Sequence, residues 1–196
     1  MGTRIYGSQP PLFDELRGER VLVRPFRAAD AEDHFVAVME SLDHVRPWLP
    51  WAAFYSTIDD SRDFIARAMA RWTLREDLIV GLWDARAGEF VGGSGLHPRD
   101  WDAGVFEIGY WIRRSAEGRG YVTEAVRLQT DFAFARLGAN RVFIRCDARN
   151  TRSAAVPRRL GVVQEALLRN DMRDPAGALR DTLVFALIPG DSRWPT

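Results

Sequence analysis

One stretch of the chain, from Glu107 to Ala125, constrains the fold more than any other. It reads EIGYWIRRSAEGRGYVTEA, in which a short run of β-branched and aromatic residues, typical of a strand, precedes a segment that is helical in character from Thr123 onward. Gly118 and Gly120 lie between the two and accept backbone angles that other residues avoid. The stretch therefore predicts an anion site, because a helix N-terminus presents unpaired N–H groups and a partial positive charge.

Two common phosphate-binding motifs are excluded by the residues of this bend. A P-loop requires a lysine after its last glycine, and the chain contains no lysine. A dinucleotide-binding fingerprint requires a third glycine, and Thr123 stands at that position. A plain turn that joins a core strand to a core helix remains the alternative without a ligand.

The stretch resembles the acyl-CoA pyrophosphate loop of the GCN5-related N-acetyltransferase (GNAT) superfamily, in particular its RimJ/RimL-like branch of ribosomal-protein acetyltransferases. EIGYWI and GRGY-x-TEA carry the resemblance, and a second pattern follows at matching spacing, with Asp147, Asn150, Ser153 and then Leu160-Gly161. The resemblance covers about residues 18–188. It implies an acetyl-CoA-dependent N-acetyltransferase that acts by direct transfer in a ternary complex.

The resemblance also implies roles for individual residues. Acetyl-CoA would be held by the strand end, the glycine loop, the helix start and an asparagine, namely Tyr110, Trp111, Ile112, Gly118, Arg119, Gly120, Tyr121, Val122, Thr123 and Asn150. Main-chain amides near the strand end would donate to the thioester carbonyl oxygen. Ser153 would lie near the thioester sulfur as a catalytic residue. Taken alone, either Asn150 or Ser153 would be interpreted as a helix cap.

Acyl transfer from a thioester to an amine requires a neutral amine. Glu107, in the strand beside the predicted CoA loop, is the candidate general base, and its alternative role is a surface carboxylate. An α-amine with a pKa near 8 is about one-tenth neutral at pH 7, so a weak base suffices for it. We therefore predict a protein or peptide N-terminal α-amine as the acceptor. The alternatives are a small-molecule amine or antibiotic, and a CoA-binding module without catalysis.

Four positions depart from the family pattern, namely Glu117, Val122, Pro157 and Val162, and two of them bear on the predicted chemistry. Glu117 places a carboxylate near the predicted pyrophosphate site, where Arg113, Arg114 or Arg119 would have to offset it. Pro157 stands where many distant relatives carry a tyrosine that protonates the leaving thiolate. The predicted enzyme therefore has no tyrosine acid at that position.

An aromatic segment over residues 45–55 separates the first two predicted helices. Its two prolines exclude a regular helix. The segment reads as a lid over the core or, by the resemblance, as one wall of the acceptor site. In the second interpretation the substrate-binding residues are Trp48, Trp51 and Tyr55.

Other reactive side chains receive smaller roles. Cys146 lies inside an apolar strand with no histidine near it in sequence, so we expect packing and not catalysis. His34, His44 and His97 have no metal-ligand spacing, and no metal site is predicted. His97 ends a strand from which it can reach the acceptor site.

The order of elements read along the chain is β-α-α-β-β-β-α-β-α-β-β. Strands are expected over 21–25, 78–84, 90–96, 105–112, 141–146, 162–168 and 179–187, and helices over about 30–41, 56–75, 123–137 and 153–160. A mixed, mostly antiparallel sheet of six or seven strands covered by about four helices is the simplest packing, an α/β (α+β) fold. Residues 18–188 form this single domain, with an N-terminal arm over 1–17 and a tail over 189–196.

The amino-acid composition limits the kinds of binding partner and the cellular location that can be expected. The 27 acidic residues balance 27 basic ones, which argues against nucleic acid or an anionic membrane as a partner. The single cysteine cannot form an internal disulfide, and no apolar run has the length of a membrane span or a signal peptide. We therefore predict a cytoplasmic protein, and the family resemblance implies a homodimer.

Overall fold

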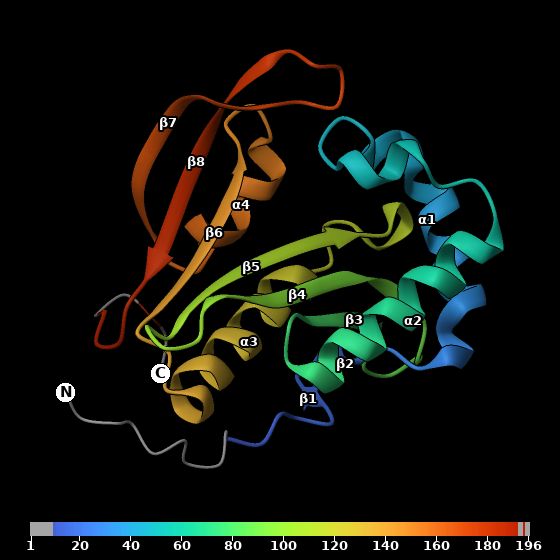
Figure 1. The fold of residues 1–196 in the computed structure, drawn as a ribbon, viewed down its shortest axis with the longest axis horizontal. Coiled ribbons are helices and arrows are strands. Elements are labelled where there is room, and N and C mark those ends of the chain that lie inside the picture. The colour runs from blue at the N-terminus through green and yellow to red at the C-terminus, as the bar shows by residue number, and fades with distance from the viewer. Residues whose placement is uncertain (1–9, 192–193, 195–196) are drawn as a thin grey trace.

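An eight-stranded sheet organises the computed structural model, which describes residues 10–191 and residue 194 (Figure 1). Its strands are β1 (Leu16–Arg17), β2 (Val21–Pro25), β3 (Leu78–Asp84), β4 (Phe90–Asp100), β5 (Val105–Ile112), β6 (Arg141–Asp147), β7 (Val163–Arg173) and β8 (Leu179–Leu187). They lie in the order β1-β2-β3-β4-β5-β6-β8-β7, and only β5 and β6 pair in parallel. The prediction of six or seven strands missed β1, because two residues carry no periodic pattern.

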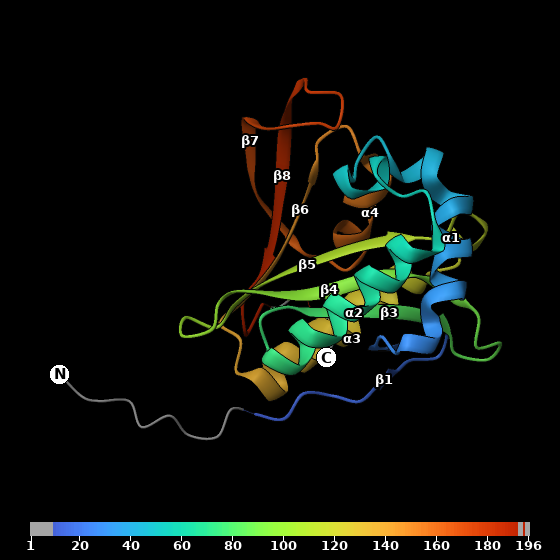
Figure 2. The same cartoon turned by 45° about the vertical axis from the view of Figure 1, so that its right-hand side comes forward.

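Four α-helices cover the two faces of this sheet (Figures 1 and 2). The helices α1 (Ala31–Val45) and α2 (Ile58–Leu74) pack together on one face, and α3 (Tyr121–Leu137) and α4 (Thr151–Arg159) pack together on the other. The predicted α/β fold and the predicted order of helices and main strands are confirmed. Between α1 and α2 the chain makes only a short 3-10 turn at Pro50–Ala53, as the two prolines require.

The largest buried cluster lies between the sheet and the pair α3 and α4. Side chains of β5 that point to this face, Phe106 and Ile108, are fully buried there. Phe13 joins the same cluster and makes edge-to-face contacts with Trp72 and Phe132. Part of the predicted N-terminal arm therefore packs on the fold, while its residues 1–9 lie outside the described part of the chain.

Capping residues set the helix starts, which fall up to two residues from their predicted positions. Thr57 and Asp60 form a capping box that begins α2. Gly120, with φ of 84°, turns the chain directly into α3. Asn150 begins α4, because its side-chain oxygen accepts a hydrogen bond from the Ser153 amide at 3.0 Å. No helix in the described part of the chain is long and apolar enough to cross a membrane.

Candidate active site

The strands β5 and β6 separate soon after they begin. Their parallel pairing joins residues 105–107 to residues 141–143 and then stops. Beyond that point β5 stays paired with β4 as far as Ile112, and β6 stays paired with β8 as far as Asp147. The two strands therefore diverge, as Figure 1 shows. In the described chain no strand covers the edge of β5 after Glu107, so main-chain groups on this edge are available to a ligand.

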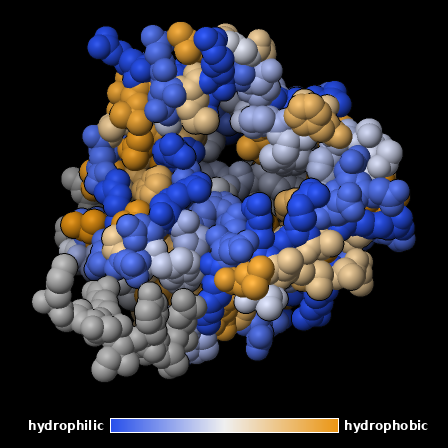
Figure 3. Space-filling view, in the orientation of Figure 1, coloured by the Kyte–Doolittle hydropathy of each residue, from blue (hydrophilic) through white to orange (hydrophobic). Residues whose placement is uncertain are grey.

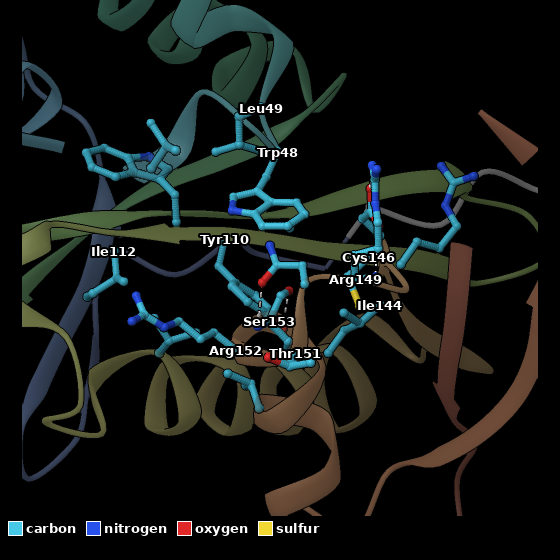
Figure 4. Close-up of a pocket in the computed structure, with 18 of the residues that line it drawn as sticks. Trp48, Leu49, Tyr110, Ile112, Ile144, Cys146, Arg149, Thr151, Arg152 and Ser153 are labelled. Carbon is cyan, nitrogen blue, oxygen red and sulfur yellow. Dashed lines mark hydrogen bonds and ion pairs between the residues drawn. The ribbon is translucent and has the colours of Figure 1, made fainter. Parts of the chain in front are cut away.

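A cavity of about 660 Å³ fills the opening between the diverging strands. Figure 3 shows the surface hollowed there, and Figure 4 shows that its walls come from β5, β6, the start of α4 and the segment after α1. Eight of the predicted site residues line it, namely Trp48, Glu107, Tyr110, Trp111, Ile112, Val122, Asn150 and Ser153. The motifs of strand, loop and second helix thus meet at one place, although they are far apart in the chain.

The glycine loop lies at the N-terminus of α3, next to this cavity. Gly118 and Gly120 both adopt left-handed backbone angles, with φ of 73° and 84°. The first-turn amides of α3 have no partner within the helix, so they are free for an anion. The side chain of Tyr121 turns away, since its hydroxyl donates to Asp84. This predicted CoA residue therefore offers only its main chain.

Glu117 is neutralised by partners other than the predicted ones. Its carboxylate accepts two hydrogen bonds from Arg152 Nη1, at 3.0 and 3.1 Å, and His44 Nε2 lies 3.0 Å away. Arg113, one of the expected partners, instead pairs with Glu40. The negative charge beside the loop is therefore already compensated by α4, which supplies Arg152.

Tyr110 connects β5 with α4 across the opening. Pro157 has no N–H, so the carbonyl of Ser153, four residues earlier in α4, loses its helical partner. The Tyr110 hydroxyl donates to this carbonyl at 2.9 Å and replaces the missing bond. The Ser153 hydroxyl in turn donates to the Tyr110 oxygen at 3.3 Å. The two hydroxyl groups therefore form a small polar cluster in the cavity wall (Figure 4).

Burial raises the pKa of two side chains in this wall above their ordinary values. Desolvation raises the pKa of Tyr110, although its hydrogen bond to Ser153 acts in the opposite direction. Burial likewise raises the pKa of the Cys146 thiol. A thiol that is buried and protonated is a poor nucleophile, which agrees with the predicted packing role of Cys146.

Glu107 lies at the point where β5 and β6 separate. It is only 9% exposed, so it is not a surface carboxylate. Arg99 Nε donates to one carboxylate oxygen at 2.8 Å, and Arg145 donates to both, at 3.1 and 3.2 Å. Both oxygens of the predicted base are therefore already hydrogen-bonded.

A family model described as "Acetyltransferase (GNAT) domain" matches residues 20–163. The chain belongs to the GNAT acetyltransferases. "Putative ribosomal N-acetyltransferase YdaF" of Bacillus subtilis (strain 168) is 31% identical to it over 156 residues, which cover 79% of this chain and 84% of YdaF. "Probable N-acetyltransferase YjcK" of the same organism is 28% identical and covers 90% of this chain and 98% of YjcK.

Solved structures share the fold of this GNAT chain. One is "Mycobacterium smegmatis RimJ in complex with CoA-disulfide", with a TM-score of 0.79 and 25% identity. The similarity covers 88% of this chain and 83% of that one. The relatives of this GNAT protein thus include the ribosomal-protein branch that its motifs resemble.

The aromatic segment contributes one side chain to the GNAT cavity. Trp48 lines it, opposite Ser153 and Arg152 of α4 (Figure 4). Trp51 and Tyr55 pack in a small cluster against α1, where their rings are 5.5 Å apart. Of the three predicted substrate contacts, the structure brings only Trp48 to the cavity.

Four arginines of the cavity wall were not predicted from the sequence. They are Arg145 on β6, Arg149 in the turn after β6, Arg152 on α4 and Arg180 on β8. Arg149 donates to Asp147 at 2.7 Å and thereby lowers the pKa of that carboxyl. The alternation of apolar and polar residues over 141–147 shows which side chains share a face of the strand. It does not show which strand or cavity lies next to that face, so the arginines could not be assigned to the site. Among residues 10–191 and 194, no three His, Cys, Asp or Glu side chains gather into a metal site.

Proposed function

We propose that this GNAT protein transfers the acetyl group of acetyl-CoA to a primary amine by direct attack in a ternary complex. The observation that carries the proposal is the uncovered edge of β5, which faces a cavity beside the N-terminus of α3. The pyrophosphate fits the free amides after Gly118 and Gly120. The pantetheine arm, itself an amide chain, fits the main-chain groups of residues 110–112. Asn150 would hold the same arm.

The reaction begins when the amine attacks the thioester carbonyl carbon. Main-chain amides at the end of β5 would stabilise the negative charge that develops on the carbonyl oxygen. The C–S bond then breaks, and the thiolate leaves beside the hydroxyl groups of Ser153 and Tyr110. Glu107 lines the same cavity and stays a prediction for the group that takes the amine proton.

A protein or peptide N-terminal α-amine is the acceptor that we propose. The name of one relative supports it, since YdaF is described as a putative ribosomal N-acetyltransferase. A second support is that Trp51 packs against Trp111 and α1, so Trp48 and Trp51 do not close over the cavity together. An open cavity suits a chain end that continues beyond the reacting amine. The predicted homodimer and the cytoplasmic location remain parts of the proposal.

Thiol release from acetyl-CoA tests this function. The purified chain is incubated with acetyl-CoA and either unblocked peptides, the same peptides with blocked N-termini, or small amines. Free thiol and acetylated peptide should form only with the unblocked peptides. Turnover with small amines alone would contradict the acceptor class. Binding of CoA without turnover on any amine would instead favour a CoA-binding module.

A further inference from the structure

A histidine and an aspartate form a hydrogen-bonded pair beside Glu107. His97 lies on β4, directly opposite Glu107 in the register with β5. Its Nδ1 is 2.5 Å from Oδ1 of Asp77, which precedes β3. Both side chains are mostly buried, with 25% and 20% exposed. The pair therefore occupies a fixed position near the cavity.

Two glycines make room for the imidazole ring. A Cβ on Gly95 would lie 2.4 Å from Cε1 of His97, and a Cβ on Gly109 would lie 3.2 Å from Nε2. The ring therefore lies across both glycines, and no larger residue fits beneath it without displacing it. Gly109 lines the cavity, whereas His97 itself does not, so Nε2 lies behind the β5 backbone at the position of Gly109.

The hydrogen bond to Asp77 determines what the other ring nitrogen can do. If the carboxylate accepts the Nδ1 proton, Nε2 carries a lone pair and can accept a proton. In the described chain Nε2 has no hydrogen-bond partner, whereas both oxygens of Glu107 are engaged by arginines. The charged groups facing the ring are Asp77, Glu107, Arg99 on the same strand, and Arg71, 3.7 Å from Asp77.

We propose that His97, oriented by Asp77, is the general base of this acetyl transfer in place of Glu107, whose two oxygens are engaged by arginines. The proposal rests on the proposed function. As the amine nitrogen forms its bond to the carbonyl carbon, its proton passes to Nε2 of His97. The C–S bond breaks, and the thiolate leaves with the electron pair. The imidazolium, stabilised by Asp77, then returns the proton to solvent, from which the thiolate takes one. Glu107 would hold Arg99 and Arg145 in place beside the acceptor.

The test compares His97→Gln, Glu107→Gln and Asp77→Asn in the full chain. Steady-state rates are measured against pH with acetyl-CoA and the peptide that the wild type acetylates. His97→Gln should lower kcat on the order of 10²-fold or more and abolish the acid limb of the kcat profile. Glu107→Gln should keep that limb. Asp77→Asn should lower kcat and shift the limb, because Asp77 acts through His97.

Rescue distinguishes a base from a packing residue. His97→Ala leaves the space above Gly95 and Gly109 empty, and added imidazole should restore part of its activity. Calorimetry with CoA should give the wild-type affinity for each variant that is folded. Wild-type kcat and an intact acid limb in His97→Gln would overturn the assignment and leave the acetyltransferase standing. A wild type that binds CoA but acetylates no amine would overturn both.

Discussion

Pro157 determines which hydrogen bond the distant Tyr110 side chain makes. The proline was visible in the sequence only as a departure from the family pattern. In the fold, Pro157 leaves the Ser153 carbonyl without a helical donor. The Tyr110 hydroxyl donates a hydrogen bond to this carbonyl instead. The tyrosine thereby ties β5 to α4 across an opening where no strand pairing exists.

This exchange of partners predicts an energetic coupling. Tyr110→Phe should lower the free energy of unfolding by about 1–2 kcal/mol, because a partly buried carbonyl loses its donor. In a Pro157→Ala background the cost should be smaller, since alanine supplies the helical N–H. Urea denaturation of the two single variants and the double variant measures the coupling. Additive effects within about 0.3–0.5 kcal/mol would mean that the residues are independent.

His34 is a buried group that the proposed chemistry does not use. It is 2% exposed, stacks on Phe64 and lies 3.0 Å from the Ser61 hydroxyl through Nδ1. Burial lowers its pKa from 6.5 to about 4, although the nearby Asp30 charge acts in the opposite direction. The folded protein therefore holds His34 neutral over a range in which the unfolded chain takes up a proton.

The pKa of His34 predicts a pH-dependent stability. Below the unfolded pKa of 6.5 the unfolded state binds more protons, so stability is lost as the pH falls toward about 4. Between about pH 7 and about pH 5 the loss should be about 2 kcal/mol, a range in which most carboxylates stay ionised. Urea unfolding of the wild type and His34→Gln measures it. An equal pH dependence in both proteins would show that His34 is not its source.

At the level of single side chains, the sequence predicted what local motifs encode. Asn150 and Ser153 were found because their spacing is a pattern within one segment, and both line the cavity. The pairing of Glu117 with Arg152 spans 35 residues and depends on how two helices meet, so no local signal predicts it. Trp51 is a second example, because its packing against α1 instead of the cavity depends on contacts between distant segments.

The glycine loop and helix α3 form one element whose proposed task is to bind phosphate. Gly120→Glu should abolish CoA binding, because a carboxylate beside the α3 amides repels the pyrophosphate and the left-handed backbone disfavours a side chain. Gly138→Glu is the matched control. Gly138 ends the same helix with φ of 66° and open space around its Cα, so the substitution adds similar strain away from the loop.

Calorimetry with CoA on both variants decides between these effects. Loss of binding in Gly120→Glu alone is the expected result. Equal affinity in a folded Gly120→Glu would remove the loop from the site. Equal loss in both variants would mean that helix strain, and not phosphate binding, is responsible.

The elements themselves were largely predictable, and their ends were not. Alternation and helical periodicity indicate each main strand and helix, because burial on one face imposes these periods. Ends depend on single contacts. The strand β4 continues through Pro98 to Asp100, where a loop was expected, because a bulge between these residues preserves its pairing with β5.

The arrangement of the whole sheet follows from packing between distant segments. The sequence predicted a mixed sheet, but it did not predict that β8 would lie between β6 and β7. Nor could strand patterns alone fix where β5 and β6 part, because each strand keeps its alternation on both sides of that point.

The whole molecule is predicted to be a homodimer by its resemblance to the RimJ/RimL branch. The outer strand β7 exposes several large apolar side chains, Val163, Leu167, Leu168 and Met172. Surfaces of this kind often mark contacts between proteins. Light scattering on the purified chain should therefore give twice the mass of the 22.2 kDa chain. A mass of one chain at micromolar concentration would contradict the prediction.

The early separation of β5 and β6 has a thermodynamic consequence. Only three residue pairs of the sheet join the strands β1–β5 to the strands β6–β8 in the described chain. The other links are the contact of α3 with α4 and side-chain hydrogen bonds such as that of Tyr110 to Ser153. A molecule bound along the open edge would bridge these two parts of the sheet, so its binding free energy would add to their cohesion. At a ligand concentration of 100 times Kd this linkage amounts to about 2.7 kcal/mol. The concentration of acetyl-CoA would then set the stability of the folded protein as well as the rate of the reaction.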